Sequence, residues 1–184
     1  VHTGLLVLDG LQLRGAADAS AMAIAVHGGR LTTRGCTASG YTHEGALHVL
    51  GAGEAIVEDS TLADNSAGGG RGGAVLVDGG SLVLRRSTLT RNEAAEGGAL
   101  YVEGADSSVL ADATSFSSNV ASRRGGGVAV AGGSVVLTNQ TFLEGNRAGA
   151  SELCAATTDE AYGGGDSVIV AGGSVTYALP APPG

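Results

Sequence analysis

A short pattern of apolar and polar positions recurs four times along the chain. In each copy a large apolar residue stands three positions before an asparagine, and an alanine stands two positions after it. The asparagines, spaced 27 residues apart, are Asn65, Asn92, Asn119 and Asn146. A pattern that returns at a fixed period of about 20 to 50 residues indicates a solenoid, a propeller or another repeat array.

Between these copies, apolar residues alternate with polar or small ones, which is typical of half-buried β-strands. Most repeats open with a glycine pair and an alternating strand such as Gly73–Val77, followed by a glycine turn (Gly79–Gly80) and a second strand, Ser81–Leu84. A third short strand leads into the asparagine. No ten-residue window has the helical period, and few Asn-Gly or Asp-Gly hairpin turns occur. The pattern predicts an all-β fold, a right-handed parallel β-helix of about seven coils with three short strands per coil.

Counting back from each asparagine assigns the positions of one coil to the inside or the outside of the helix. Positions ten, eight and three residues before the asparagine should be interior, and their burial should be the main stabilising term, at about 25 cal/mol per Å². The predicted interior residues are Ala55, Leu82, Val109 and Val136; Val57, Leu84, Ala111 and Thr138; and Leu62, Leu89, Phe116 and Leu143. The position seven before is polar and should face solvent (Glu58, Arg85, Asp112, Asn139).

The asparagine row has a structural interpretation. Asparagine tolerates left-handed turn geometry, and its amide bonds neighbouring backbone. When asparagines stack one coil apart, each amide can also donate to the amide oxygen of the next. We therefore predict a structural ladder of Asn65, Asn92, Asn119 and Asn146 rather than a ligand site.

The position nine before each asparagine should point outward between two inward positions. It is apolar in every repeat: Ile56, Val83, Leu110 and Leu137. Such a continuous exposed apolar stripe usually marks an interaction surface. The alternative is that the insertion, a neighbouring loop or a flanking domain covers it, and both interpretations stay open at this stage.

Composition narrows the possible partners. All ten basic residues are arginine, and 18 acidic residues give a formal charge of −8, so no basic face for nucleic acid is expected. No apolar run is long enough to span a membrane. Residues 1–177 are expected to form one domain with an insertion at about 150–162, followed by a Pro-rich linker at 178–184. The start at Val1 indicates a processed form or a piece of a longer protein.

Two motifs resemble those of a known family. Gly72-Gly-Ala-Val75 and Gly97-Gly-Ala-Leu100 match an alternating Gly-Gly-Ala-(Ile/Leu/Val) motif, and Phe116–Asn119 matches Phe-x-x-Asn. Together they resemble the repeats of chlamydial polymorphic outer membrane proteins. The resemblance implies a parallel β-helix of the pectin-lyase-like type, displayed at a cell surface in an adhesive or structural role. It transfers no catalytic residue, because these motifs occupy turn and core positions.

An enzyme of the pectin-lyase-like type is the main alternative. A glycosidase needs two carboxyl groups about 5 to 9 Å apart, and the acidic residues are scattered over different positions of the repeat (Asp59, Asp64, Asp78, Glu103, Asp106 and Asp112). Asp78 and Glu103 hold equivalent turn positions and should lie close together. The histidines (His27, His43, His48) and the Gly163–Val168 turn do not make a convincing metal site, so no metal, cofactor or catalytic residue is assigned.

Two cysteines and one sequon complete the candidate sites. Cys36 shares a position of the repeat with Ser60, Ser87, Thr114 and Thr141, and we expect it to be buried and free. Cys154 lies about four coils later, too far for a disulfide with Cys36, and is expected to be exposed or paired outside this segment. Asn139-Gln-Thr141 is a possible N-glycosylation site.

These observations favour a non-catalytic structural or adhesive module of a larger cell-surface or filament protein. Extracellular localisation is expected. The partners would be other protein chains, including copies of this chain in a self-assembled filament, or glycans. A polysaccharide lyase or glycoside hydrolase remains the alternative.

Overall fold

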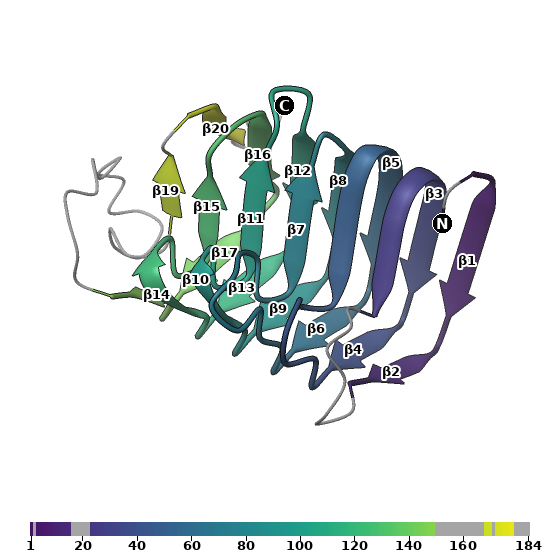
Figure 1. The fold of residues 1–184 in the computed structure, drawn as a ribbon, viewed down its shortest axis with the longest axis horizontal. Helices are drawn as coiled ribbons and strands as arrows, with labels where there is room; N and C mark the ends of the chain where they lie inside the picture. Colours follow the sequence, from purple (N-terminus) through teal and green to yellow (C-terminus); the bar gives the residue numbers. More distant parts are fainter. Residues whose placement is uncertain (2, 16–22, 150–167, 171, 179–184) are drawn as a thin grey trace, which may run out of the picture.

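The computed structural model describes residues 1, 3–15, 23–149, 168–170 and 172–178. Within these ranges the chain is a parallel β-solenoid of about five turns, in which all named strands pair in parallel (Figure 1). An all-β parallel solenoid is thus confirmed, whereas the count of about seven coils is not. The predicted insertion at 150–162 and residues 179–184 of the predicted linker lie outside the described residues.

The strands form three sheets. The 11-stranded sheet holds β1 (Leu5–Asp9), β3 (Ile24–Arg34), β5 (Leu47–Glu58), β7 (Val75–Asp78), β8 (Ser81–Arg85), β11 (Leu100–Glu103), β12 (Ser108–Asp112), β15 (Val128–Val130), β16 (Ser134–Thr138), β19 (Val168–Val170) and β20 (Ser174–Ala178). The six-stranded sheet holds β2 (Gln12–Arg14), β4 (Thr37–Ser39), β6 (Thr61–Ala63), β9 (Thr88–Thr90), β13 (Ser115–Ser117) and β17 (Phe142–Glu144). The three-stranded sheet holds β10 (Glu93–Glu96), β14 (Val120–Arg124) and β18 (Arg147–Ala148).

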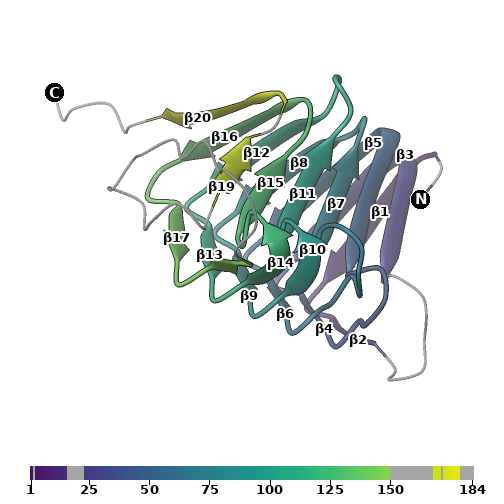
Figure 2. The same cartoon turned by 60° about the vertical axis from the view of Figure 1, so that its left-hand side comes forward.

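The large sheet supplies two walls of the solenoid. Strand β5 is long enough to serve both, because it pairs with β7 along its first half and with β8 along its second half. In later coils the corresponding path is split by a turn, at Gly79–Gly80 between β7 and β8. The six-stranded sheet forms the third wall, and the three-stranded sheet runs along one corner beside β11 and β15 (Figure 2).

The interior is a single apolar core of stacked rows that extends through the coils. All four residues three positions before an asparagine are buried, and so are the residues predicted to be interior in β5, β8 and β12. The predictions for β16 are wrong. Val136 and Thr138 are only partly buried, and their neighbours Val135 and Leu137 take the interior places.

Turn lengths explain this error. Strand β15 starts 28 residues after its partner β11, β16 starts 26 after β12, and β17 starts 27 after β13. The longer and shorter turns compensate for each other before the next asparagine, so the asparagines stay 27 residues apart. Because successive residues of a strand point to opposite faces, a displacement of one residue exchanges inside and outside. The count from Asn146 is therefore right in β17 and wrong in β16.

Left-handed turn geometry also falls on different residues than expected. Positive φ occurs at the residue before each ladder asparagine: Asp64, Arg91, Ser118 and Gly145. A second row with positive φ closes the turn that follows β5, β8, β12 and β16: Asp59, Arg86, Ala113 and Asn139. The ladder asparagines themselves do not have positive φ. Their side chains, and not their backbone angles, explain why asparagine is required.

The ladder is continuous through four coils. The side-chain amide of Asn65 donates to Asn92 Oδ1 at 3.0 Å, that of Asn92 to Asn119 Oδ1 at 3.0 Å, and that of Asn119 to Asn146 Oδ1 at 2.9 Å. Each receiving oxygen also accepts the backbone N–H of the preceding asparagine. The second amide hydrogen of each donates to a backbone carbonyl, for example Leu62 O at 3.0 Å from Asn92. All four are buried.

A second polar row runs through the turns that enter the six-stranded sheet. It contains Cys36, Ser60, Ser87, Thr114 and Thr141, all buried. The backbone N–H of Cys36 donates to Ser60 Oγ, and that of Ser60 donates to Ser87 Oγ. The hydroxyls in turn donate to backbone carbonyls, such as Ser87 Oγ to Arg85 O at 2.8 Å. Both rows satisfy buried backbone groups at corners where no ladder of strand hydrogen bonds is available.

Replacing Asn92 by alanine should destabilise the protein. The change removes the oxygen that accepts the backbone N–H and one side-chain N–H of Asn65, and it removes one donor to the carbonyl of Leu62. We expect the free energy of unfolding to fall by about 1–3 kcal/mol. Urea melts followed by circular dichroism would measure this. Ser122→Ala, at an exposed position of β14, is the control and should change stability by less than about 0.5 kcal/mol. Coincident melts of Asn92→Ala and the parent would contradict the structural role of the ladder.

Candidate functional site

The apolar stripe exists, with one residue different from the prediction. Ile56 on β5 is in register with Val83 on β8, Val83 with Leu110 on β12, and Leu110 with Val136 on β16. Leu137, predicted as the fourth member, is buried in the interior, because β16 is displaced by one residue relative to the asparagine count. We call Ile56, Val83, Leu110 and Val136 the outer stripe.

The outer stripe is half-buried rather than fully exposed. It continues into Thr32 at one end and Thr176 at the other. On one side lies a row of serines, Ser81, Ser108, Ser134 and Ser174. On the other side lies a charged row, Arg34, Glu58, Arg85 and Asp112. The apolar stems of long arginine side chains cover neighbouring apolar surface, so the available stripe is narrow.

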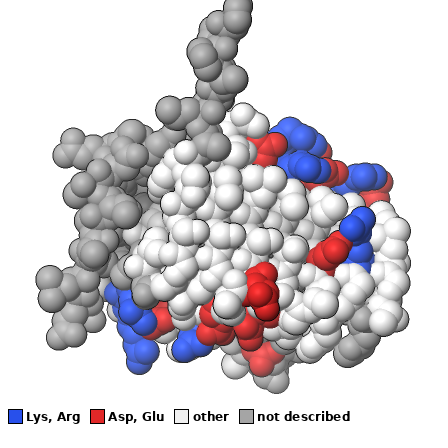
Figure 3. All heavy atoms as spheres, turned by 90° about the horizontal axis from the view of Figure 1, so that it is seen from above, with Lys and Arg blue, Asp and Glu red and all other residues white. Residues whose placement is uncertain are grey.

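Many charged side chains on the described surface form pairs between adjacent coils. Seen from above, blue and red side chains lie beside one another near the margins of a mostly uncharged surface (Figure 3). Glu58 lies 3.1 Å from both Arg34 and Arg85, which come from the coils on either side of it. Three further ion pairs also join adjacent coils: Arg30–Glu54, Arg86–Asp59 and Arg91–Asp64. Opposite charges directly across strands stabilise the stacking, each by a modest amount.

Ion pairing lowers the pKa of three of these carboxylates, Glu58, Asp59 and Asp64, below the usual range. Hydrogen bonds from Arg34, and then from Arg85, lower the pKa of Glu58. Arg86 lowers the pKa of Asp59 in the same way, and Arg91 lowers that of Asp64. These groups are engaged in structural ion pairs, so a depressed pKa here reports coil stacking and not a catalytic acid.

A second cluster lies on the outer surface of β7, β11 and β15. Tyr101, only 3% exposed, packs with Ala129 and Leu76 in an apolar group separate from the main core. The guanidinium of Arg71 lies over the Tyr101 ring, 5.1 Å from its centroid, and pairs with Glu103 at 2.7 Å. Burial raises the pKa of Tyr101. We call Tyr101 with its charged neighbours Arg71, Glu96, Glu103 and Arg124 the Tyr101 cluster.

Glu96 is the most buried carboxylate of this cluster, at 6% exposed. It accepts hydrogen bonds from Arg124 at 3.0 and 3.2 Å, and Arg123 lies 3.9 Å away. Arg71, Glu96 and Arg124 stand at equivalent positions of successive coils. Sequence reasoning missed this cluster. The available signal was the residue before each glycine pair, which alternates in sign along Arg71-Gly-Gly, Glu96-Gly-Gly and Arg124-Gly-Gly.

In the described part of the chain, the remaining acidic residues and histidines considered as candidates do not form a site. Asp78 and Glu103 are register partners in adjacent coils, as expected, although Glu103 is bound by Arg71. His48 shares the outward row of Leu76, Tyr101 and Ala129, and burial lowers its pKa. Within the described ranges, no group of three or more His, Cys, Asp or Glu residues is arranged to hold a metal ion.

The cysteine and sequon predictions have different outcomes. Cys36 is buried and free, as predicted. Cys154 lies outside the described residues. Asn139 is exposed, with its amide 2.5 Å from Asp112 Oδ1, while the hydroxyl of Thr141 is buried and bonded to backbone carbonyls. Whether Asn139 carries a glycan stays a prediction.

Comparisons with protein-family models, with curated proteins and with solved structures found no match for this chain. The resemblance to polymorphic outer membrane protein repeats therefore rests on the motifs alone. Across the part of the chain that the structure describes, no helix has the length and apolar character needed to cross a membrane.

Glu58 gives a pH-dependent prediction. Its pKa is lower in the folded than in the unfolded protein, so its stabilising contribution is present above the ordinary carboxyl pKa and is lost as pH falls through the lowered value. Replacing Glu58 by glutamine should reduce the urea midpoint at pH 7, and the difference from the parent should shrink toward pH 3. Glu144→Gln, at an exposed position on β17, is the control and should show a smaller pH-dependent difference. A Glu58→Gln deficit that is constant with pH would contradict the ion-pair account.

Proposed function

We propose that this chain is a non-catalytic structural or adhesive module of a larger extracellular, cell-surface or filament protein. It forms a right-handed parallel β-helix of the pectin-lyase-like type, and it works by presenting long rigid faces to other protein chains or glycans. The contact we propose to test is self-association through the outer stripe.

The observation that carries the proposal is the regularity of the outer surface. The outer stripe runs across four neighbouring strands in exact strand register, bordered by a serine row and an ion-paired row. A row of apolar side chains between two polar rows can pack against the same row of a second copy. Association would cover apolar surface that the isolated chain leaves partly exposed.

The internal ladders support a mechanical rather than a catalytic role. The asparagine row and the hydroxyl row tie each coil to the next through buried hydrogen bonds. Ion pairs join the same coils on the outside. A module held together in this way keeps its faces in fixed geometry, which suits a spacer or a scaffold.

The resemblance of the Gly-Gly-Ala and Phe-x-x-Asn motifs to repeats of surface-displayed proteins supports the localisation and the handedness. An acidic, lysine-free composition is compatible with solubility outside a cell.

Charging the outer stripe should prevent self-association without unfolding the chain. In the double variant Val83→Lys, Leu110→Lys, two ammonium groups would have to be desolvated at each contact, which is costly. We expect sedimentation velocity to show concentration-dependent association of the parent and a monomer for the variant, with the same far-ultraviolet circular dichroism. The matched control is Thr88→Lys, Ser115→Lys. It places the same charges on the six-stranded sheet of the same two coils and should associate like the parent.

Equal association of the stripe variant and the parent would eliminate the stripe as the contact. Product release from acidic polysaccharides, assayed with and without Ca²⁺, would instead favour the carbohydrate-active enzyme.

A further inference from the structure

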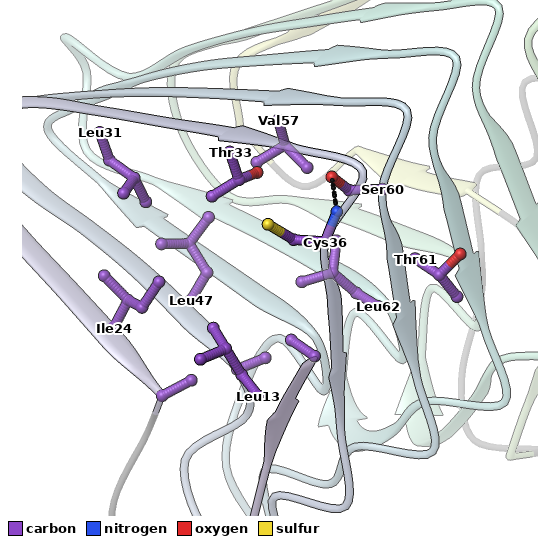
Figure 4. A pocket seen from close by; sticks show the side chains of 13 residues that line it. Leu13, Ile24, Leu31, Thr33, Cys36, Leu47, Val57, Ser60, Thr61 and Leu62 are labelled. Atoms are coloured by element: carbon purple, nitrogen blue, oxygen red, sulfur yellow. Dashed lines mark hydrogen bonds between the residues drawn. The ribbon is translucent and has the colours of Figure 1, made fainter. Parts of the chain in front are cut away.

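A small, partly open cavity lies between the early coils and is lined mainly by residues of β2, β3, β4, β5 and β6. Its volume is about 30 Å³. Most of its wall is aliphatic, and Leu13, Ile24, Leu31, Leu47 and Leu62 are among the lining residues (Figure 4). Leu13 and Ile24 are only partly buried, so the cavity lies near the surface on that side.

One small residue in an otherwise large row contributes to this space. Ala38 stands in an interior row whose other members are Leu13, Leu62, Leu89, Phe116 and Leu143. Thr33 is the polar member of a row whose other residues include Leu8, Val57, Leu84, Ala111 and Leu137. Replacing a leucine by alanine in a packed core leaves a void that costs stability.

The cavity also contains an unusual polar group. The hydroxyl of Thr33, a residue 6% exposed, is the one buried side-chain oxygen or nitrogen in the described residues that has no hydrogen-bond partner. Leaving a buried hydroxyl unpaired is unfavourable. Such a group calls for an explanation, and a redox role is one of the recognised ones.

The thiol of Cys36 lines the same cavity. Its sulfur points inward, toward the side of Thr33 and Leu47 (Figure 4). The backbone N–H of Cys36 is held by Ser60 Oγ at 3.1 Å, and the sulfur lies 3.3 Å from Arg34 O and 3.5 Å from Leu8 O. The cavity thus brings together a nucleophilic sulfur, an unpaired hydroxyl and space for about one small group.

We propose that this cavity is a modification site in which hydrogen peroxide oxidises Cys36 to a sulfenic acid that Thr33 stabilises. This site is independent of the outer stripe and of any self-association. Hydrogen peroxide is small and uncharged, and the Thr33 hydroxyl with the carbonyls of Arg34 and Leu8 beside the sulfur can hydrogen-bond it. Larger or charged reagents do not fit this cavity.

The reaction consumes one thiol and one hydrogen peroxide and gives one sulfenic acid and one water. The Cys36 sulfur attacks one peroxide oxygen, the S–O bond forms as the O–O bond breaks, and the departing hydroxide takes the thiol proton. Sulfur loses two electrons and the peroxide gains them. The Thr33 hydroxyl donates a hydrogen bond to the new oxygen. The aliphatic wall keeps large thiols away, so the product persists instead of condensing to a disulfide.

The test uses the full chain carrying Cys154→Ser, so that Cys36 is its remaining cysteine. The folded protein is treated with hydrogen peroxide, the excess is removed with catalase, and the chain is unfolded in the presence of dimedone. Peptide mass spectrometry then measures the dimedone adduct at Cys36. We expect an adduct that is absent without peroxide and absent in Cys36→Ser.

Two further variants test the cavity and the threonine. Ala38→Leu restores the residue that the row holds in other coils, and it should lower the rate of adduct formation about ten-fold or more because it closes the space around the thiol. Thr33→Val keeps the shape of the side chain and removes the hydroxyl. It should shorten the lifetime of the sulfenic acid about ten-fold, which is seen as earlier sulfinic acid.

Neither variant should unfold the protein, since each removes a void or an unpaired group, and circular dichroism would verify this. No adduct in the folded protein, with ready reaction of the unfolded chain, would overturn the proposal. So would equal oxidation of the parent and Ala38→Leu. Equal sulfenic acid lifetimes in the parent and Thr33→Val would remove the role of Thr33.

Discussion

In-register parallel stacking is the constraint on which this structure depends. Each position of one coil lies directly beside the same position of the next coil. Every residue must therefore pack against the residue at that position in the neighbouring coils, which is often of the same type. Aliphatic residues satisfy this by simple packing. Asparagine satisfies it because its amide is donor and acceptor at once, so one residue type can repeat through four coils with every group paired.

Like charges at the same position of adjacent coils repel each other, and two rows on the surface avoid this. Their sign alternates from coil to coil: Arg34, Glu58, Arg85 and Asp112 in one row, Arg71, Glu96 and Arg124 in another. Asp78 and Glu103 are adjacent acids, and Arg71 pairs with Glu103. The same requirement favours a core of medium-sized side chains, because a large aromatic residue in one coil must be accommodated by the coils on both sides. Phe116 shows that one such residue fits when its row neighbours are Leu89 and Leu143.

Much of the fold could be predicted because the repeating unit is visible in the chain. The asparagine row and the apolar row three positions before it lie in the same short segment, so no variable turn separates them, and both were placed correctly. The outer stripe was harder. Val135, Val136 and Leu137 are all apolar, so the pattern alone could not decide which of them point outward in β16. Which of these residues point outward depends on the lengths of the turns around β16. A longer turn and a shorter turn compensate within the coil, so the interval between asparagines does not reveal the displacement. The Tyr101 cluster was missed because Tyr101 and Glu103 come from other rows than Arg71, Glu96 and Arg124, and because the three-stranded corner sheet shows no clear alternation.

The asparagine ladder also has a direction. Every interamide hydrogen bond runs from the earlier coil to the later one, and the oxygen of Asn65 accepts the backbone N–H of Tyr41 from the coil before. The amide dipoles therefore align along the solenoid, and the two ends of the ladder are chemically different: one end offers acceptors and the other offers donors. A coil can be duplicated or lost in whole units between two asparagines with this polarity preserved. Such a chain can therefore change its length in steps of one coil. An extra single residue would instead exchange the inside and outside of the next strand until a later turn compensates, as happens at β16 and β17.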